Sequence, residues 1–320
     1  MDTSDPALFA RFADSVRRLS GGADGALGVA ISGGPDSLAL LLLAGAAFPG
    51  KVHCATVDHG LRAESADEAR FVGECCGELG VPHAVLPVSI GKGNTADRAR
   101  AARYEALASW ASDRDIGRIA TAHHADDQAE TLMMRLNRAS GVGGLSGIRE
   151  HVSIAGAEII RPLLDWSHSE LAALVEARGW AAVDDPSNRD PRSDRARMRA
   201  QLADTGWLDR PAIAASAAHL AEADAALDWM ADRIVADDVW MDGDRLAMQH
   251  DLPRALALRV IERILARVGE GRPGVSEIAR LHDALVRGDV GTLAGVVARP
   301  GRHVWRFGKE ASRADHTRGN

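Results

Sequence analysis

Short apolar runs alternate with longer helical patterns along the first half of the chain. Runs of strand length occupy residues 26–31, 52–57, 81–88 and 116–122. Segments typical of helices occupy residues 6–19, 38–43, 64–80, 95–113, 125–138 and 169–178. Strands that alternate with helices in this way predict a parallel sheet covered on both faces. We therefore expect a doubly wound, mostly parallel α/β domain.

The pattern changes after about residue 200. Residues 205–211 combine Gly and Pro with polar residues and form the predicted boundary, so we place the first domain at 1–205 and the second at 206–320. Helical segments at 212–239, 251–269 and 274–288 precede β-like runs at 293–298 and 303–307. We expect a smaller, mainly helical second domain.

A glycine-rich hexapeptide follows the first apolar run. It consists of Ser32, Gly33, Gly34, Pro35, Asp36 and Ser37. Glycines let backbone N–H groups approach an anion, and a helix N-terminus favours negative charge, so this strand, loop and helix indicate a phosphate site. The serine hydroxyls add donors, and the Asp36 carboxylate suits Mg²⁺. The structural alternative is a tight turn in which Ser or Asp caps the helix.

Three acids open the helix predicted at 125–138. They are Asp126, Asp127 and Glu130, and they follow His123 and His124 directly. One acid would be explained by the helix dipole, which stabilises it by about 0.3–1 kcal/mol. Clustered carboxylates suit Mg²⁺ or an incoming ammonium group, so we expect at least one of the three to take part in chemistry. Either histidine would donate to a phosphate oxygen or merely satisfy a backbone carbonyl.

Other polar residues fall where the sheet should bind ligands. Asp58 and His59 follow the second strand, and ligands of such sheets lie beyond the carboxyl ends of the strands. This pair would contact a nucleotide, or form a turn capped by the Asp. Arg100 and Arg103 are three apart on one helix and would hold phosphate or RNA, although a solvated helix face explains them almost as well.

Two basic tracts and one glycine-dense segment complete the candidates. Residues 188–199 contain five Arg, among them Arg195 and Arg199, and six basic residues lie between 299 and the end. Such tracts are what a segregated RNA-binding surface requires, and a solvated surface is the alternative. Trp305 and Phe307 are the only rings near the second tract, so base stacking is not evident. Residues 138–147 form either a lid or an idle connection.

Composition narrows the class of protein. The net charge of −7 argues mildly against nucleic-acid binding, but segregated charge can override it. Three cysteines without a Cys-x-x-Cys pair exclude a disulfide framework and indicate buried apolar residues. With no uncharged apolar run of about eighteen residues and an acidic N-terminus, we expect no membrane span, no signal peptide and a cytoplasmic location.

The hexapeptide resembles the pyrophosphate-binding loop of the PP-loop ATPases. Four further stretches resemble the tRNA(Ile)-lysidine synthase family within that superfamily. They are Val-Asp-His-Gly-Leu-Arg at 57–62, Asn94 with Ala-Arg-Ala-Ala-Arg-Tyr at 99–104, Ala-His-His-Ala-Asp-Asp-Gln-Ala-Glu-Thr at 122–131, and Asp-Pro-Ser-Asn at 185–188. Their order and spacing agree with that family between about residues 26 and 199.

The resemblance implies a fold of the adenine nucleotide α-hydrolase type and a specific reaction. ATP would adenylate the wobble cytidine of an isoleucine tRNA with a CAU anticodon, and free L-lysine would then displace AMP. Asp36, His123, Asp126, Asp127 and Glu130 would be catalytic, with Asp36 and Asp127 as ligands of Mg²⁺. The hexapeptide, Asp58 and His59 would bind ATP, and Arg100, Arg103, Arg195 and Arg199 would bind substrate or tRNA. A homodimer is a candidate assembly.

Two other functions stay open. One is a PP-loop amidotransferase or ligase that acts on a small molecule, and the other is a non-catalytic nucleotide-binding regulator. The chain also departs from the family pattern, because Ala139 stands where Gly is usual and Ala196 where Asn is usual. Both departures affect lid or RNA contacts more than ATP chemistry.

Overall fold

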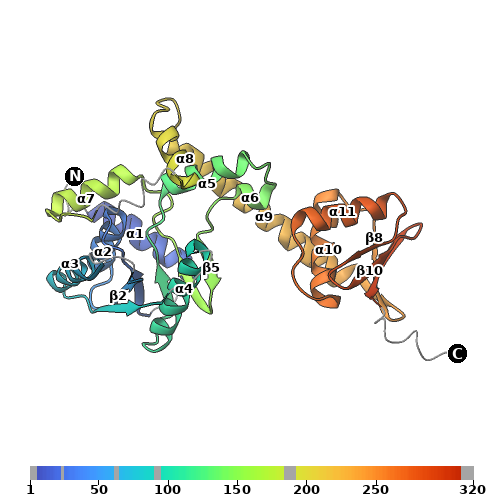
Figure 1. The fold of residues 1–320 in the computed structure, drawn as a ribbon, viewed down its shortest axis with the longest axis horizontal. Coiled ribbons are helices and arrows are strands. Elements are labelled where there is room, and N and C mark those ends of the chain that lie inside the picture. Colours follow the sequence, from blue (N-terminus) through green and yellow to red (C-terminus); the bar gives the residue numbers. More distant parts are fainter. Residues whose placement is uncertain (1–5, 23–24, 61–64, 90–94, 184–191, 311–320) are drawn as a thin grey trace. The chain divides into compact units, whose positions relative to one another are not determined.

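Two compact units make up the protein. The computed structural model describes residues 6–22, 25–60, 65–89, 95–183 and 192–310 (Figure 1). The units comprise Met1–Ala221 and Glu222–Asn320. Their division falls within one long helix, α9 (Arg210–Asp237), at a point beyond the Gly- and Pro-containing segment where the sequence pattern changes. Among the described helices, none has the length and apolarity needed to cross a membrane.

The first unit is built on a six-stranded sheet with the order β3-β2-β1-β4-β6-β5. Every neighbouring pair is parallel except β5 and β6, so the predicted, mostly parallel sheet is confirmed. The strands are β1 (Leu27–Ala30), β2 (Val52–Asp58), β3 (His83–Pro87), β4 (Arg118–Ala120), β5 (His151–Ile154) and β6 (Ala157–Ile160).

Helices cover both faces of this sheet (Figure 1). One core joins the sheet to α1, α2, α3 and α7, and the other joins it to α4. α2 is apolar on all sides because it is enclosed, and Leu38 within it is fully buried, which stabilises the fold by about 1.5–3 kcal/mol. These helices are α1 (Pro6–Leu19), α2 (Pro35–Ala47), α3 (Ser65–Glu78), α4 (Thr95–Ser112) and α7 (His168–Arg178).

Our sequence analysis did not predict the hairpin formed by β5 and β6. Its two strands are joined at Ala155 and Gly156, both of which have positive φ, as a two-residue hairpin turn requires. The remaining helices of this unit are α5 (Ala125–Leu136), the single turn α6 (Val142–Leu145) and α8 (Asp194–Ala203). α5 begins directly after the strand end that carries the two adjacent histidines.

The second unit combines helices with an antiparallel sheet of order β7-β8-β11-β10-β9. The expected run at 293–298 is in fact a hairpin, because the chain reverses at Ala294 and Gly295, which both have positive φ. The β7–β8 hairpin was likewise not expected. Its elements are β7 (Val239–Asp242), β8 (Arg245–Gln249), α10 (Arg254–Val268), α11 (Val275–Val286), β9 (Gly291–Leu293), β10 (Val296–Arg299) and β11 (Val304–Lys309).

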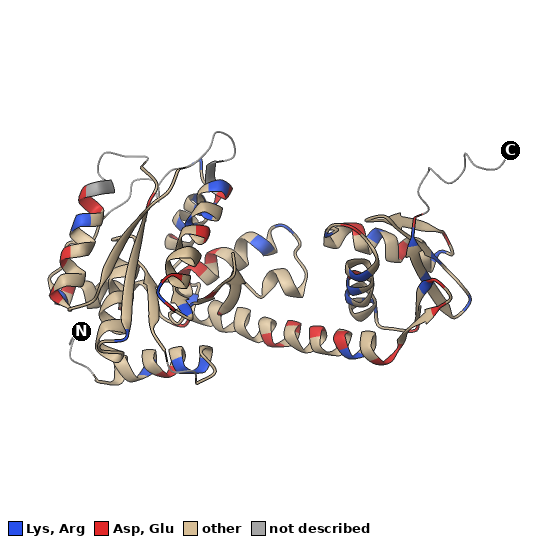
Figure 2. Cartoon of the chain, turned by 90° about the horizontal axis from the view of Figure 1, so that it is seen from below, with Lys and Arg blue, Asp and Glu red and all other residues tan. Residues whose placement is uncertain are grey.

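Ion pairs fasten α10 to the acidic second half of α9. Figure 2 shows acidic residues spaced along that helix. Arg259 pairs with Asp224 and Asp228, and Arg263 bonds Asp228 at 2.9 Å and Asp232 at 2.5 Å. These acids therefore serve the packing of the second unit.

Candidate active site

The phosphate loop is closed by its own serines. Ser37 Oγ donates to the Gly34 carbonyl at 2.9 Å and accepts from the Ser32 backbone N–H at 3.2 Å. Gly34 caps α2 without a side-chain bond, and Pro35 follows it at the first helical position, where a missing N–H costs nothing. The loop thus presents backbone donors at the start of a helix, as the sequence predicts.

Gly33 is required by both backbone and packing. Its φ is +84°, and a Cβ built there would lie 3.1 Å from a methyl group of Val183. The Val183 backbone N–H donates to the Gly33 carbonyl at 3.0 Å, which fastens the loop to the segment after α7. A side chain at position 33 would push these two segments apart.

Three helix N-termini meet at this loop. α2 begins after Gly34, α5 after His124 and α7 after Ser167. The imidazole of His124 lies 3.4 Å from Asp36 in the first turn of α2, and His168 Nδ1 in the first turn of α7 lies 2.7 Å from Asp36. Each helix directs the positive end of its dipole here, so the site favours an anion.

Asp36, His124 and His168 form one compact group. Each offers a ligand atom, and the three atoms lie within 4.8 Å of one another. Burial opposes charge on Asp36, but hydrogen bonds from His124 and His168 prevail and lower the pKa of its carboxyl. Burial also opposes charge on His124, but the neighbouring carboxylates, Asp126 and Asp36 first among them, raise the pKa of this imidazole to about 10. His124 is therefore a cation at neutral pH.

The three acids of α5 are each paired with an arginine. Asp126 binds Arg210 and also accepts from the His168 backbone N–H at 2.9 Å. Asp127 lies 2.8 Å from Arg195, and its second oxygen accepts from the His124 backbone N–H at 3.2 Å. Among the described residues, Asp36 is thus the carboxylate of this site that has histidine partners and no arginine.

Glu130 is the most enclosed of these acids, with 2 % of the residue exposed. It lies 2.8 Å from Arg195 Nε and 2.6 Å from Arg199 Nε, both on α8. The hydrogen bond to Glu130 raises the pKa of Arg199. Two arginines of the basic tract therefore face the acid cluster, and they hold an ionised carboxylate in a buried position.

His123 has the opposite electrostatic environment from its neighbour. Burial lowers its pKa well below the usual value, and nearby guanidinium groups lower it further, namely those of Arg161, Arg103, Arg195 and Arg100. Its Nδ1 lies 3.0 Å from Thr121 Oγ1. Adjacent histidines thus differ in charge, because one faces carboxylates and the other faces arginines. His123 is neutral at neutral pH.

The guanidinium groups around His123 form a cationic hollow, defined by Arg100, Arg103 and Arg161. Burial lowers the pKa of Arg103, and no described carboxylate pairs with it. Arg161 Nε and His59 Nδ1 are buried and lack hydrogen-bond partners. Buried donors that stay unsatisfied are costly, so this hollow is suited to receive an anion or a polar group from a ligand.

Asp58 and His59, at the end of β2, have different surroundings. Asp58 accepts from the Gly60 backbone N–H at 2.8 Å, as expected for a capped turn, and lines a cavity of about 600 Å³ beside α3 and β3. Burial lowers the pKa of His59, and the charge of Arg103 lowers it further, so His59 belongs with the cationic hollow. The capped turn thus describes Asp58, and a nucleotide contact by this pair stays a prediction.

The glycine-dense segment after α5 is tied to that helix. Arg135 donates to the Gly147 carbonyl at 3.0 Å, and the Gln128 side chain donates to Ile148 O and accepts from Ile148 N. These bonds favour a packed connection over a lid. Asn94 and the stretch at 185–188 lie outside the described residues, as do residues 61–62 of another motif.

The structure adds three residues that our sequence analysis did not select: His168, Arg161 and Arg210. His168 lies in an ordinary N-terminal capping box, Ser167 to Glu170, so nothing in its local sequence indicated a ligand. Arg161 follows β6, a strand that was not predicted. Had the alternation around Gly156 been read as a hairpin, Arg161 would have been placed at a strand end beside His123.

Comparison with known proteins identifies the family. Residues 10–205 match the PP-loop domain family. A tRNA(Ile)-lysidine synthase of Novosphingobium aromaticivorans is 47 % identical over 286 residues, 88 % of each chain, and that of Zymomonas mobilis is 40 % identical over 301 residues, 90 % of each chain. Among solved structures, the U34-tRNA thiolase NcsA from Methanococcus maripaludis, with its [4Fe-4S] cluster, is similar with a TM-score of 0.54 and 18 % identity.

That structural similarity covers 67 % of this chain and 79 % of the thiolase, and at this identity it shows the fold alone. The three cysteines here are buried and free. The matching PP-loop domain contains the hexapeptide and the acid cluster, and the relatives extend the match over most of the chain. The chain therefore belongs to the tRNA(Ile)-lysidine synthase family of ATP-dependent PP-loop ligases.

Proposed function

We propose that the protein joins free L-lysine to the wobble cytidine of a tRNA(Ile) with a CAU anticodon, at the expense of ATP. The observation that supports this most directly is the meeting of the phosphate loop with the start of α5, where Asp36 lies 3.4 Å from His124 and 2.7 Å from His168. A helix N-terminus favours the phosphates of a nucleotide, and the carboxylates beside it suit a cation. The family supports the substrates, since the named relatives are tRNA(Ile)-lysidine synthases.

In the first step the cytidine O2 attacks the α-phosphorus of ATP, a new oxygen–phosphorus bond forms, and the bond to pyrophosphate breaks. Backbone donors of the Ser32 to Ser37 loop and the N-terminus of α2 hold the pyrophosphate as negative charge gathers on it. His124 is protonated and lies beside Asp36, so it donates to the departing phosphate from the same side.

The carboxylates fit a magnesium ion. Asp36 shares a group of ligand atoms within 4.8 Å of one another with His124 and His168, and Asp127 Oδ2 lies 3.6 Å from the same His124. Carboxylate and phosphate oxygens are the ligands that Mg²⁺ prefers. When bound there, Mg²⁺ would neutralise charge on the triphosphate, and Asp36 is the better placed ligand because no arginine competes for it.

In the second step the lysine ε-amine attacks C2 of the adenylated cytidine, and AMP leaves as the carbon–oxygen bond breaks. Lysine carries an ammonium and a carboxylate, and the α5–α8 cluster offers both complements, the carboxylates of Asp127 and Glu130 and the guanidinium groups of Arg195 and Arg199. The attacking amine must be neutral. A carboxylate of this cluster takes the proton, because burial and nearby arginines lower the pKa of His123 and make its ring a weak base.

The cationic hollow is the candidate site for the RNA or the α-phosphate. Arg100 and Arg103 reach it from α4 and Arg161 from the end of β6, without carboxylate partners among the described residues. Arginines suit phosphate because their donors bind it in pairs. The second unit supplies further RNA contacts in this proposal.

Incorporation of labelled lysine into RNA tests this function. The full chain, ATP, Mg²⁺ and a CAU-anticodon transcript should yield acid-precipitable label, AMP and pyrophosphate in equal amounts. A matched transcript with G in place of the wobble C should take up none. Pyrophosphate exchange into ATP without RNA would instead support a ligase for a small molecule, and absence of turnover under all conditions would support a regulator.

A further inference from the structure

A second cavity lies far along the chain from the active site, in the unit formed by Glu222–Asn320. Its volume is about 450 Å³, within the usual range of about 300–1,000 Å³ for small-molecule sites. We call it the Trp305 pocket. It is lined by His250, Leu285, Val286, Gly288, Pro300, Gly301, Arg302 and Trp305.

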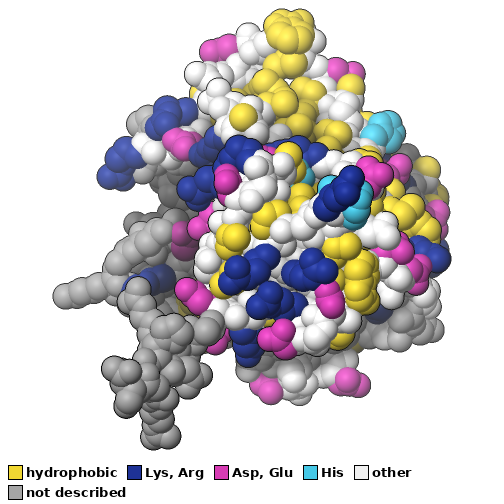
Figure 3. All heavy atoms as spheres, turned by 90° about the vertical axis from the view of Figure 1, so that its right-hand side faces the viewer, with side chains coloured by type: hydrophobic (Ala, Val, Ile, Leu, Met, Phe, Trp, Pro, Cys, Tyr) yellow, Lys and Arg dark blue, Asp and Glu magenta, His cyan; other side chains and the backbone are white. Residues whose placement is uncertain are grey.

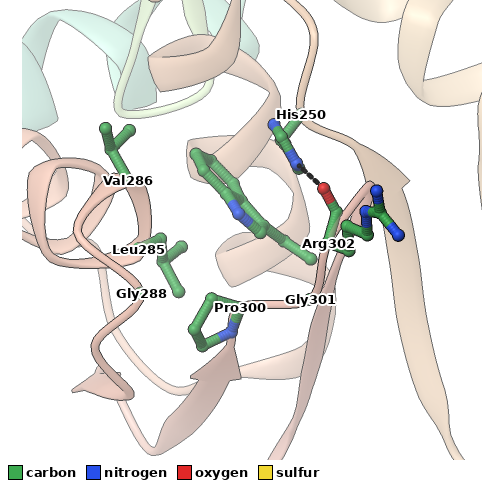
Figure 4. A pocket seen from close by; sticks show the side chains of 8 residues that line it. His250, Leu285, Val286, Gly288, Pro300, Gly301 and Arg302 are labelled. Atoms are coloured by element: carbon green, nitrogen blue, oxygen red, sulfur yellow. Dashed lines mark hydrogen bonds between the residues drawn. The ribbon is translucent and has the colours of Figure 1, made fainter.

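The pocket has one apolar and one polar side (Figure 4). Leu285 and Val286, from the end of α11, lie opposite His250 and Arg302. His250 Nε2 lies 3.1 Å from the Arg302 carbonyl, so this nitrogen donates and Nδ1 is left as an acceptor in the neutral ring. This combination suits a flat ring with polar edges better than an aliphatic chain.

Aromatic stacking is already built into the wall. The rings of His250 and Trp305 stack with their centres 5.2 Å apart and an angle of 19° between their planes. The ring of His282 lies edge-on to Trp305, with the ring centres 5.6 Å apart. Trp305 is only 3 % exposed, which fixes its ring in place. Unpaired bases are bound by stacking on such rigid aromatic groups.

The Trp305 indole N–H is an unused donor in this wall. Among the described residues none accepts a hydrogen bond from it, and its nitrogen is not one of their buried unsatisfied atoms, so the N–H is open to the pocket. An acceptor on a ligand in the pocket would receive this hydrogen bond, and base edges carry such acceptors.

Arg302 is the arginine among the residues that line the pocket. It is exposed and has no ion-pair partner among the described residues. Figure 3 shows one face of the protein, on which Lys and Arg side chains lie among acidic and hydrophobic ones. A ligand with a phosphate fits this setting, whereas an apolar peptide would gain nothing from it.

We propose that the Trp305 pocket binds one unpaired nucleotide of the RNA substrate, its base against the His250–Trp305 stack and its phosphate beside Arg302. This inference rests on the proposed function, because it takes the RNA to be that enzyme's substrate. It differs from our sequence interpretation, in which base stacking was not evident near the C-terminal basic tract. The partner ring, His250, is distant in sequence and was therefore overlooked.

Zero-length ultraviolet cross-linking of the full chain to the CAU-anticodon transcript tests the location. Mass spectrometry should find nucleotide adducts on the peptides that carry His250 or Trp305, and His250→Ala should abolish the adduct on its own peptide. Adducts confined to the first unit would overturn the proposal. A parallel cross-linking experiment with added AMP distinguishes a nucleotide of the RNA from a free nucleotide. If AMP protects these peptides at concentrations that leave RNA binding intact, the pocket binds a free nucleotide instead.

Affinity measurements test the chemistry. Arg302→Ala should weaken transcript binding about fivefold and lower the salt slope by about one. Arg272→Ala is the matched control, because it removes an exposed arginine at the opposite end of α11, whose twelve residues span about 18 Å. Equal losses of affinity in both variants would show that positive charge in general, and not the Trp305 pocket, accounts for RNA binding.

Trp305→Phe keeps an aromatic ring and removes the N–H, so it should weaken binding about fivefold. The smaller ring leaves a cavity in the core and lowers the thermal midpoint, so binding is compared at a temperature at which the variant is folded. If that variant folds poorly, His250→Ala tests the same contact with the base, because His250 is partly exposed and its loss should also weaken transcript binding. Lysine incorporation by the unsubstituted chain at saturating RNA is measured separately. A chain that cross-links at the Trp305 pocket but transfers no lysine would refute the proposed function and leave the RNA pocket standing.

Discussion

His168 Nδ1 lies 2.7 Å from Asp36 Oδ1, although 132 residues separate them in the chain. The contact exists because α7 packs against α2 and begins at the phosphate loop. This bond favours the protonated form of the His168 ring, because the Asp36 carboxylate raises the pKa of His168 above its usual value. Asp36 is thereby held between two imidazoles, and its carboxylate is fixed in direction before ATP arrives.

We expect His168→Ala to lower the rate of ATP-dependent lysine transfer about tenfold, because Asp36 loses a charge-assisted hydrogen bond. His168→Asn should recover part of the rate, since its amide nitrogen can replace Nδ1. His151→Ala is the control, because His151 forms a similar ion pair with Glu158 on the exposed β5–β6 hairpin. Steady-state rates at saturating ATP decide the matter, and equal effects at both histidines would show that the Asp36 contact is irrelevant.

The lysine cluster can be tested on α8. Arg199→Ala removes one of two partners of buried Glu130, which should cost about 1–3 kcal/mol of stability and raise the lysine concentration needed for half-maximal rate. Arg197→Ala, two residues earlier, removes a surface pair with Asp194 and should change neither value. Denaturation midpoints and lysine titrations at fixed ATP measure both. A larger effect on ATP than on lysine would place lysine elsewhere.

Stability should depend on pH through His124. Its pKa is about 10 in the folded protein, above the value of about 6.5 in an unfolded chain. A raised folded pKa adds stability that is fully present below about pH 6.5 and is lost progressively as the pH rises towards 10. The unsubstituted chain should therefore lose stability over that range, and His124→Gln should lose less. Urea midpoints at several pH values measure the difference, and parallel curves would contradict it.

The sequence predicted four of the five parallel strands, β1 to β4, because each is a short apolar run that precedes a polar turn. The β5–β6 and β7–β8 hairpins were missed because β5 and β7 are edge strands with exposed or half-exposed side chains, and because a single residue separates β7 from α9, so the apolar residues of β7 continue the helical pattern. The acid cluster could be predicted, since its members are neighbours on one helix. Its partners could not, because Arg210 and His168 reach it only through the packing of α9 and α7.

Gly33 offers the sharpest test of the phosphate loop. Gly33→Ala forces a side chain into a backbone with φ of +84° and brings a Cβ to 3.1 Å from Val183, so the loop must shift. We expect a loss of about 1–2 kcal/mol in stability from the backbone and a loss of ATP binding from the displaced donors. Gly50→Ala has nearly the same backbone strain, with φ of +73°, but no atom within 4 Å of its Cβ. It should lose similar stability and bind ATP normally. Calorimetric titration with ATP separates the two variants, because strain alone would affect them equally, whereas a displaced phosphate cradle would affect only Gly33→Ala.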